Sequence, residues 1–240
     1  MLLKTRGIVL RALKYSETSL IIEIYTEAQG LKKYIVSGVR SRKAKVSANL
    51  LQVMSLLDII AYNKQGKDLN RIKELKSFYT YQKLPFNVYR SSVGLFITEV
   101  AQKTLRQSES NEALFRFLLA IYTHLDQSEQ SIANVHLYFL VHFTQFLGFT
   151  PDGNYDTSHP YFNLREGTFM KSDAKKYALN QRLSQLLSQL LDSSLEDSHQ
   201  ISMNRLERHQ FVDQLLRYYQ LHIDNFPKIS AHAILKEVLE

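Results

Sequence analysis

The chain has 240 residues, of which 45% are hydrophobic and 22% charged, a composition typical of a folded protein with a sizeable core. It has no cysteine, which excludes disulfides, thiolate-bound metals and cysteine nucleophiles and fits a reducing compartment. The N-terminal MLLKTRG reaches charged residues too early for a signal peptide, and the longest uncharged stretch, 131–150, is interrupted by Asn, His, Thr and Gln. We therefore expect a cytoplasmic protein without a membrane span.

The positive charge is unevenly distributed along the chain. The formal net charge is +7, but residues 1–83 hold sixteen Lys or Arg against six Asp or Glu, and residues 84–240 hold fourteen against seventeen. Such asymmetry predicts two domains, the first with a polyanionic partner. We place the first domain at residues 1–80 and the second at 81–240.

Five short strands are predicted in the first domain because apolar and polar residues alternate there with a period of two. They cover residues 4–11, 19–26, 31–37, 55–62 and 69–77. Residues 27–30, EAQG, form a hairpin turn in which Gly30 suits a positive φ. Five strands with one excursion between the third and fourth indicate a small closed barrel of the oligonucleotide/oligosaccharide-binding (OB) type, and an SH3-like barrel also fits the count.

Residues 30–45 concentrate positive charge around the third strand. Six of these sixteen residues are Lys or Arg and none is acidic: Lys32, Lys33, Arg40, Arg42, Lys43 and Lys45. A strand that ends in Gly38 and leads into a basic loop suits contact with a phosphate backbone, although a solubilising surface loop has the same composition. In the last strand, Arg71, Lys73 and Lys76 could extend this basic surface.

Tyrosines lie on or beside the barrel strands, at positions 15, 25, 34 and 62. On an OB surface a tyrosine ring can stack on a base, which contributes about 1–3 kcal/mol per base. Half-buried strand tyrosines with hydrated hydroxyls are the alternative.

After Pro85 the apolar period becomes 3.6, which predicts helices. We expect them at 87–107, from a Ser110 cap to about 125, and at 131–147, 174–192, 203–222 and 231–239, with Gly148 and Pro151 ending the third. A hairpin at 161–164 and 168–170 occupies an insertion at about 150–172. The fold class is therefore α+β, an OB-fold barrel followed by an all-α domain with a β-hairpin insertion.

No catalytic or cofactor motif is present. The eight histidines show no metal-ligand spacing, there is no phosphate-binding glycine loop or GxSxG, and the carboxylates form no acid–base pair. We expect no enzyme activity, no cofactor and no metal.

Several segments resemble the RecO recombination-mediator family. GIVL (7–10), YSETSLIIEIYTEAQG (15–30) and SGVRSRKAK (37–45) are similar to its N-terminal OB domain, and FLGFTPD (146–152) to a segment of its helical domain. The resemblance implies a bacterial, nucleoid-associated DNA repair protein of the RecFOR recombination pathway, active after DNA damage. It implies binding of single- and double-stranded DNA, annealing of complementary strands, and help from RecR in loading RecA onto DNA coated by single-strand binding protein (SSB).

The resemblance also assigns sites. Phosphate contacts fall on Arg40, Arg42, Lys43 and Lys45, with Lys32 and Lys33 in support. The C-terminal tail of SSB would bind near His136, Phe139, Leu140 and Phe143 in the helical domain, where core packing is the alternative.

One departure from the family concerns zinc. Many relatives carry four zinc-binding cysteines after the FLGFTPD-like segment, and this chain has none. Asp152, Asp156 and His159 do not make a substitute tetrahedral set. We therefore expect the insertion to be held by packing alone.

A protein-interaction adaptor whose basic barrel binds an acidic protein surface is the alternative function. A nucleic-acid enzyme would instead require clustered carboxylates and a divalent metal.

Overall fold

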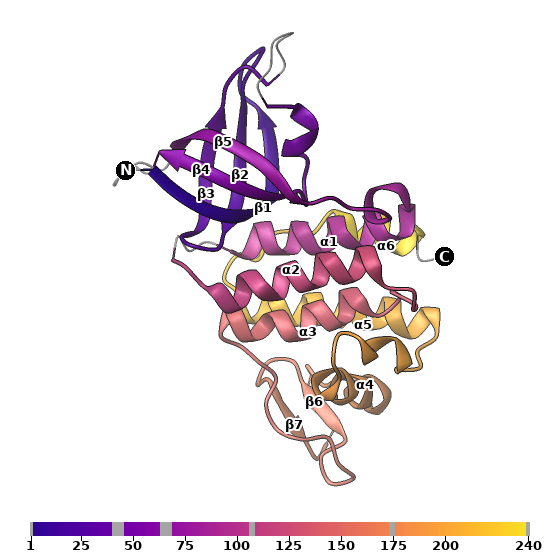
Figure 1. Cartoon of the computed structure of the whole chain (residues 1–240). Helices are drawn as coiled ribbons and strands as arrows, with labels where there is room; N and C mark the ends of the chain where they lie inside the picture. The colour runs from indigo at the N-terminus through magenta and orange to yellow at the C-terminus, as the bar shows by residue number, and fades with distance from the viewer. Residues whose placement is uncertain (1, 40–45, 63–68, 106–108, 173–175, 239–240) are drawn as a thin grey trace. The chain divides into compact units, whose positions relative to one another are not determined.

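The computed structural model of the chain describes residues 2–39, 46–62, 69–105, 109–172 and 176–238. Five strands close into a barrel in the order β1-β2-β3-β5-β4, and Figure 1 labels each of them. They are β1 (Leu2–Lys14), β2 (Leu20–Thr26), β3 (Gly30–Val36), β4 (Leu56–Tyr62) and β5 (Leu69–Tyr79). All neighbours are antiparallel except β3 and β5. The predicted OB-like barrel within an α+β fold is confirmed.

The barrel core follows from the alternation of the strands. Residues that alternate inward on the strands form one buried cluster that includes Ile22, Ile24, Tyr34, Leu57 and Ile59. At Gly7 the backbone of β1 packs directly against two core side chains. A Cβ added there would lie 2.4 Å from Ile24 Cγ2 and 2.8 Å from Ile59 Cδ1. A larger residue at that position would displace the core. Gly30 has φ 64°, as predicted for the hairpin turn.

The structure divides into two compact units. The first comprises Met1–Asn87 with Thr98–Asp126, and the second Val88–Ile97 with Gln127–Glu240. Helix α1 (Val88–Thr104) contributes to both, so these units do not coincide with a division of the chain near residue 80. Within the first unit the outer face of β2 is covered, because Gln102 Nε2 donates to Glu23 Oε2 at 3.0 Å and Ser110 Oγ donates to the Glu27 carbonyl at 3.0 Å.

The start of α2 (Glu112–Gln127) corrects one prediction. Ser110 was expected to cap this helix, but the Leu114 amide donates to Asn111 Oδ1 at 2.9 Å, so Asn111 is the capping residue. Ser110 is instead used in the contact with Glu27 described above.

A buried carboxylate, Asp126, fixes the chain as it leaves the barrel. Its side chain accepts hydrogen bonds from the Tyr79 hydroxyl at 2.9 Å and from the Lys83 and Leu84 amides at 2.8 Å each, and the Gln82 amide lies 3.0 Å away. Burial raises the pKa of Asp126, but the backbone amides and the tyrosine hydroxyl lower it more, so its pKa lies below the ordinary value. The residue is 1% exposed and ionised, and donors from chain segment 79–84 surround its charge.

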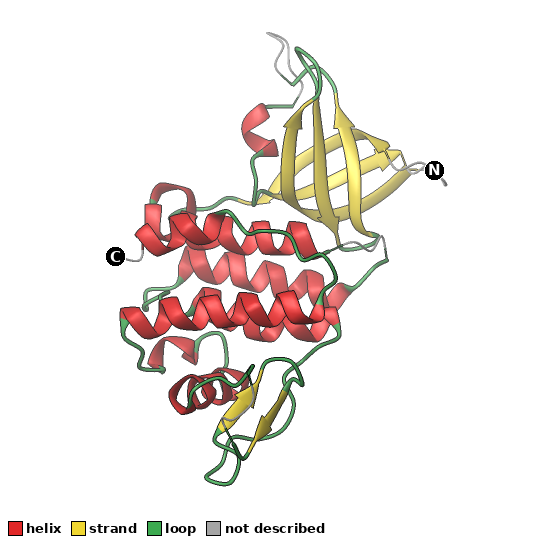
Figure 2. Cartoon of the chain, turned by 180° about the vertical axis from the view of Figure 1, so that it is seen from behind, coloured by secondary structure: helices red, strands yellow, loops and turns green. Residues whose placement is uncertain are grey.

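Besides the first part of α1, the second unit contains four α-helices and a small sheet among its described residues. The helices are α3 (Val135–Leu147), α4 (Gln181–Asp192), α5 (Arg205–His222) and α6 (Ala231–Val238), and the strands are β6 (Tyr161–Asn163) and β7 (Thr168–Met170), drawn in yellow in Figure 2. Gly148 ends α3 with φ 84° and donates its amide to the Thr144 carbonyl, as predicted.

Helix α4 begins later than the predicted 174. Residues 176–180 precede it outside the helix, where the Leu164 amide donates to the Tyr177 carbonyl at 2.9 Å and the Leu179 amide to the Phe162 carbonyl at 2.8 Å. These two hydrogen bonds hold segment 176–180 against the β6–β7 hairpin. Helix α5 likewise begins at Arg205 with a capping box of Asn204 and Glu207, in place of the predicted start at 203 after Ser202.

Aromatic packing holds the cysteine-free insertion. The Phe162 ring centroid lies 5.1 Å from that of Phe169 and 5.7 Å from that of Tyr218. The Tyr218 hydroxyl donates to the Phe149 carbonyl at 2.7 Å, and His222 Nε2 lies 2.9 Å from the Leu164 carbonyl oxygen. These contacts attach the hairpin to α5 through rings and backbone carbonyls.

Replacing Asp126 with Asn should destabilise the protein by about 3 kcal/mol, because an amide cannot supply the charge-assisted acceptors that three backbone amides and Tyr79 require. Urea denaturation at neutral pH measures the change. Asp213→Asn is the matched control: Asp213 pairs with Lys236 at the surface at 2.8 Å, and its removal should cost less than about 1 kcal/mol. Equal destabilisation of the two variants would contradict the role given to Asp126.

Candidate nucleic-acid interface

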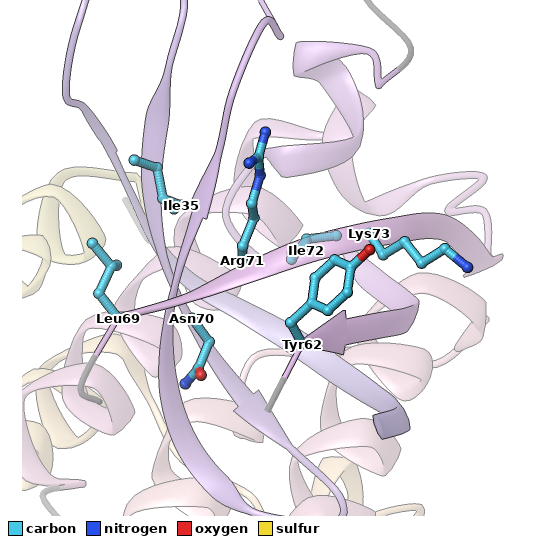
Figure 3. A pocket seen from close by; sticks show the side chains of 7 residues that line it. All are labelled: Ile35, Tyr62, Leu69, Asn70, Arg71, Ile72 and Lys73. Carbon is cyan, nitrogen blue, oxygen red and sulfur yellow. The ribbon is translucent and has the colours of Figure 1, made fainter. Parts of the chain in front are cut away.

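A cavity of about 550 Å³ opens on the barrel where β3 and β5 meet. Among the described residues the two strands pair at three positions, Lys33 with Leu69, Tyr34 with Asn70 and Ile35 with Arg71. Figure 3 shows the side chains that line the cavity, which are Ile35, Tyr62, Leu69, Asn70, Arg71, Ile72 and Lys73.

Strand alternation explains why the cavity is both cationic and apolar. Along β5 the residues Leu69, Arg71 and Lys73 are exposed, whereas Asn70 and Ile72 between them are buried. Arg71 is paired with Ile35 on one neighbouring strand and with Tyr62 on the other. A guanidinium therefore stands between an aliphatic side chain and a tyrosine that is 42% exposed.

The cations at this surface differ in how far they are neutralised. Within the described ranges no carboxylate lies within 4 Å of Arg71. Lys73 Nζ lies 3.4 Å from Glu74 Oε1, but both side chains are exposed and such pairs contribute little. Arg71 and Lys73 are thus available to a phosphate.

The predicted pair Lys32 and Lys33 does not act as one patch. Lys33 faces Glu23, with Nζ 3.9 Å from Oε1, and Glu23 also lies 3.9 Å from Arg11 Nη1. The register places Lys32 opposite Ile24, which belongs to the barrel core, so the two lysines lie on opposite faces of β3. Adjacent charged residues in a strand point to opposite faces. Of these two lysines, Lys33 is the one with a nearby carboxylate. The loop residues predicted as phosphate contacts, Arg40, Arg42, Lys43 and Lys45, lie outside the described residues.

The four tyrosines separate into two groups. Tyr25 and Tyr34 are 2% and 1% exposed, and burial raises the pKa of each to about 12. They are core residues. Tyr15 and Tyr62 are 62% and 42% exposed, and of these two Tyr62 lines the cavity.

Sequence comparison adds a second line of observation. Residues 1–81 match the family model "Recombination protein O N terminal", and residues 85–231 match "Recombination protein O C terminal". A protein named DNA repair protein RecO from Christiangramia forsetii is 36% identical over 240 residues, which cover 99% of each chain. The chain belongs to the RecO family. Proteins of the same name from Bacteroides fragilis and Flavobacterium psychrophilum are 36% and 35% identical over all or 99% of both chains.

The RecO resemblance assigns the SSB tail to the neighbourhood of four residues on α3, and the structure places all four in the helical core, which is the alternative given for them. The four residues, His136, Phe139, Leu140 and Phe143, are each 0% exposed. Phe139 and Phe143 stack with ring centroids 4.7 Å apart, and the Tyr219 hydroxyl donates to the Leu140 carbonyl at 2.8 Å. These residues are part of the helical core, so they do not line an open groove.

In the described part of this RecO-family chain, no helix is long and apolar enough to cross a bilayer. Nor does any group of three or more His, Asp or Glu there have the geometry of a metal site.

Sequence reasoning missed the way the cavity is assembled. It named Tyr62, Arg71 and Lys73 separately, but not the apolar Ile35 and Leu69 beside them. A strand of period two would have placed Leu69, Arg71 and Lys73 on one face, but the letters L-N-R-I-K do not show which face is exposed, because Leu69 is exposed and Asn70 is buried.

The buried His136 makes stability sensitive to acid. Burial, together with the charges of Arg208, His209 and His232, lowers the pKa of His136 to about 3, and neither ring nitrogen has a hydrogen-bond partner among the described residues. Between about pH 6.5 and pH 3 the unfolded chain binds a proton that the native state does not, so the free energy of unfolding falls as pH falls, by about 1.4 kcal/mol per pH unit.

The variant His136→Leu should therefore show a free energy of unfolding that declines less steeply between pH 6 and pH 4, by about 1.4 kcal/mol per pH unit. Urea titrations across that range measure it. Phe139→Leu disturbs the same core without removing a titrating group, and it should lower stability equally at each pH. Parallel slopes for wild type and His136→Leu would refute the explanation.

Proposed function

We propose that this RecO-family protein is a recombination mediator that binds single- and double-stranded DNA at the barrel surface around Arg71. The observation that carries the proposal is a guanidinium, without an acidic partner among the described residues, between Ile35 and the exposed Tyr62 in a cavity of about 550 Å³. Arg71 and Lys73 would contact phosphates, and the Tyr62 ring would stack on a base. Lys33, which lies on the same face of β3 as Ile35, would add a partly neutralised cation, and Arg40, Arg42, Lys43 and Lys45 are proposed as further phosphate contacts.

This arrangement supports annealing without catalysis. Two complementary strands repel each other through their phosphates, and cations on one protein surface lower that repulsion when both strands are bound. No nucleotide hydrolysis is needed in such a mechanism. In this proposal the protein acts at the bacterial nucleoid, and RecR and the SSB tail are its partners while RecA is loaded.

Removing two cations from the cavity tests DNA binding. The double variant Arg71→Gln/Lys73→Gln should bind every single-stranded sequence more weakly, and the slope of log K against log salt should become shallower by about 1.4, or 0.7 for each phosphate that the protein no longer neutralises. Fluorescence anisotropy with labelled poly(dT) at several salt concentrations measures both.

The control for that experiment is Lys103→Gln/Lys236→Gln, which removes the same charge from lysines already paired with Glu99 and Asp213. Its salt slope should match wild type. If neither double variant alters the slope, the barrel surface does not bind DNA, and an acidic protein partner becomes the better candidate.

A second test addresses stacking. Tyr62→Leu should weaken binding to poly(dT) about tenfold, at the lower end of the 1–3 kcal/mol expected for one stacked base, whereas Tyr62→Phe should bind nearly as well as wild type. On an abasic oligonucleotide of the same length, Tyr62→Leu and wild type should be equal. Weakening of equal size on both oligonucleotides would show that Tyr62 acts by some means other than stacking.

A further inference from the structure

Three cationic side chains converge on the ring of Tyr177 in the second unit. Arg165 Cζ lies 5.8 Å from the ring centroid, Lys176 Nζ 5.8 Å and Arg217 Cζ 5.2 Å. They come from three different segments, which are the turn between β6 and β7, the segment before α4, and α5. We call these three cations, together with the ring, the Tyr177 cluster.

The backbone around the ring is fixed. Tyr177 is held by the hydrogen bond from the Leu164 amide to its carbonyl at 2.9 Å, and the next residue, Ala178, forms a β-bridge with Asn163. Asn163 also orders the turn that carries Arg165, since its Oδ1 accepts the Arg165 amide at 2.9 Å. The cluster therefore rests on a rigid hairpin, which limits the ordering cost of binding a ligand there.

The charges of the cluster are not balanced by acidic side chains in the described parts of the chain, where no carboxylate lies within 4 Å of any of the three. Arg165 and Lys176 are exposed, and Arg217 is half-buried. The negative face of a tyrosine ring attracts cations and offsets part of their mutual repulsion. A bound anion would offset more of it.

We propose that the Tyr177 cluster is a second phosphate-binding site, one that holds the backbone of a DNA strand. This inference rests on the proposed function, because it takes DNA as the polyanion that the chain binds. Two guanidinium groups are suited to paired contacts with phosphate oxygens. Since the cations occupy the ring, Tyr177 would position them rather than stack on a base, so the contact is independent of sequence.

Annealing requires contact with two DNA strands, and a second phosphate-binding site would supply the second contact. Bringing two strands together requires a protein that contacts both, and the barrel cavity and the Tyr177 cluster lie in different compact units of the chain. Each unit would then supply phosphate contacts of its own.

The test uses the full chain with the triple substitution Arg165→Gln/Lys176→Gln/Arg217→Gln. On long poly(dT) its slope of log K against log salt should be shallower than that of wild type by about 2, or 0.7 for each of three phosphates. An abasic strand of the same length should give the same change, because only the backbone is bound. Thermal melting checks that the variant is folded, and if it is not, Arg165→Gln alone should lower the slope by about 0.7.

Two substitutions of Tyr177 test whether the ring positions the three cations or whether their charge alone is sufficient for binding. Tyr177→Phe keeps the aromatic face and should retain the wild-type slope and affinity. Tyr177→Leu keeps all three cations but removes the ring that gathers them, and it should weaken binding several-fold.

An unchanged slope for the cluster variants, while Arg71→Gln/Lys73→Gln lowers it, would overturn this inference and leave the proposed function standing. If both sets leave the slope unchanged, the proposed function fails as well. Complete disappearance of the salt dependence in the barrel variant alone would also exclude a second site.

Discussion

The first unit depends on one buried carboxylate. Asp126 on α2 is 1% exposed and accepts hydrogen bonds from Tyr79, at the end of the last barrel strand, and from the amides of Gln82, Lys83 and Leu84. A charge is costly to bury, and it is tolerated here because donors surround it. The three amides of the segment that leaves the barrel need acceptors, so the same contact satisfies both the acid and the backbone. Barrel and helix α2 are joined at this point.

At the proposed DNA surface, strand register decides which charged side chains lie on the same face. Residues that are adjacent in the sequence, such as Lys32 and Lys33, are separated onto opposite faces, and Lys33 is partly neutralised by Glu23. Residues from three different strands, by contrast, are brought together as Ile35, Arg71 and Tyr62. A cationic group beside apolar side chains can hold a phosphate and a base at once. The register of a strand therefore decides which of its cations share a face.

The second unit shows what holds an insertion that has no cysteine. Rings of Phe162, Phe169 and Tyr218 pack on one another, and side chains of α5 bond the backbone carbonyls of Phe149 and Leu164. Packing of this kind needs no thiolate and no bound ion. It also leaves the hairpin rigid enough to carry Arg165 toward Tyr177.

The sequence by itself determined the barrel, the order of the helices and the family, because periods of two and 3.6, turn glycines such as Gly30 and Gly148, and contiguous motifs are local properties of the chain. It did not determine which of several plausible residues are exposed. His136, Phe139, Leu140 and Phe143 could be core or groove from their letters alone, and only packing against α5 and its neighbours buried them. The sequence predicted Ser110 as the cap of α2, but in the structure Ser110 donates to the Glu27 carbonyl and Asn111 caps the helix. The convergence of Arg165, Lys176 and Arg217 on Tyr177 was likewise decided by tertiary structure, since those side chains come from three segments whose proximity no local pattern encodes.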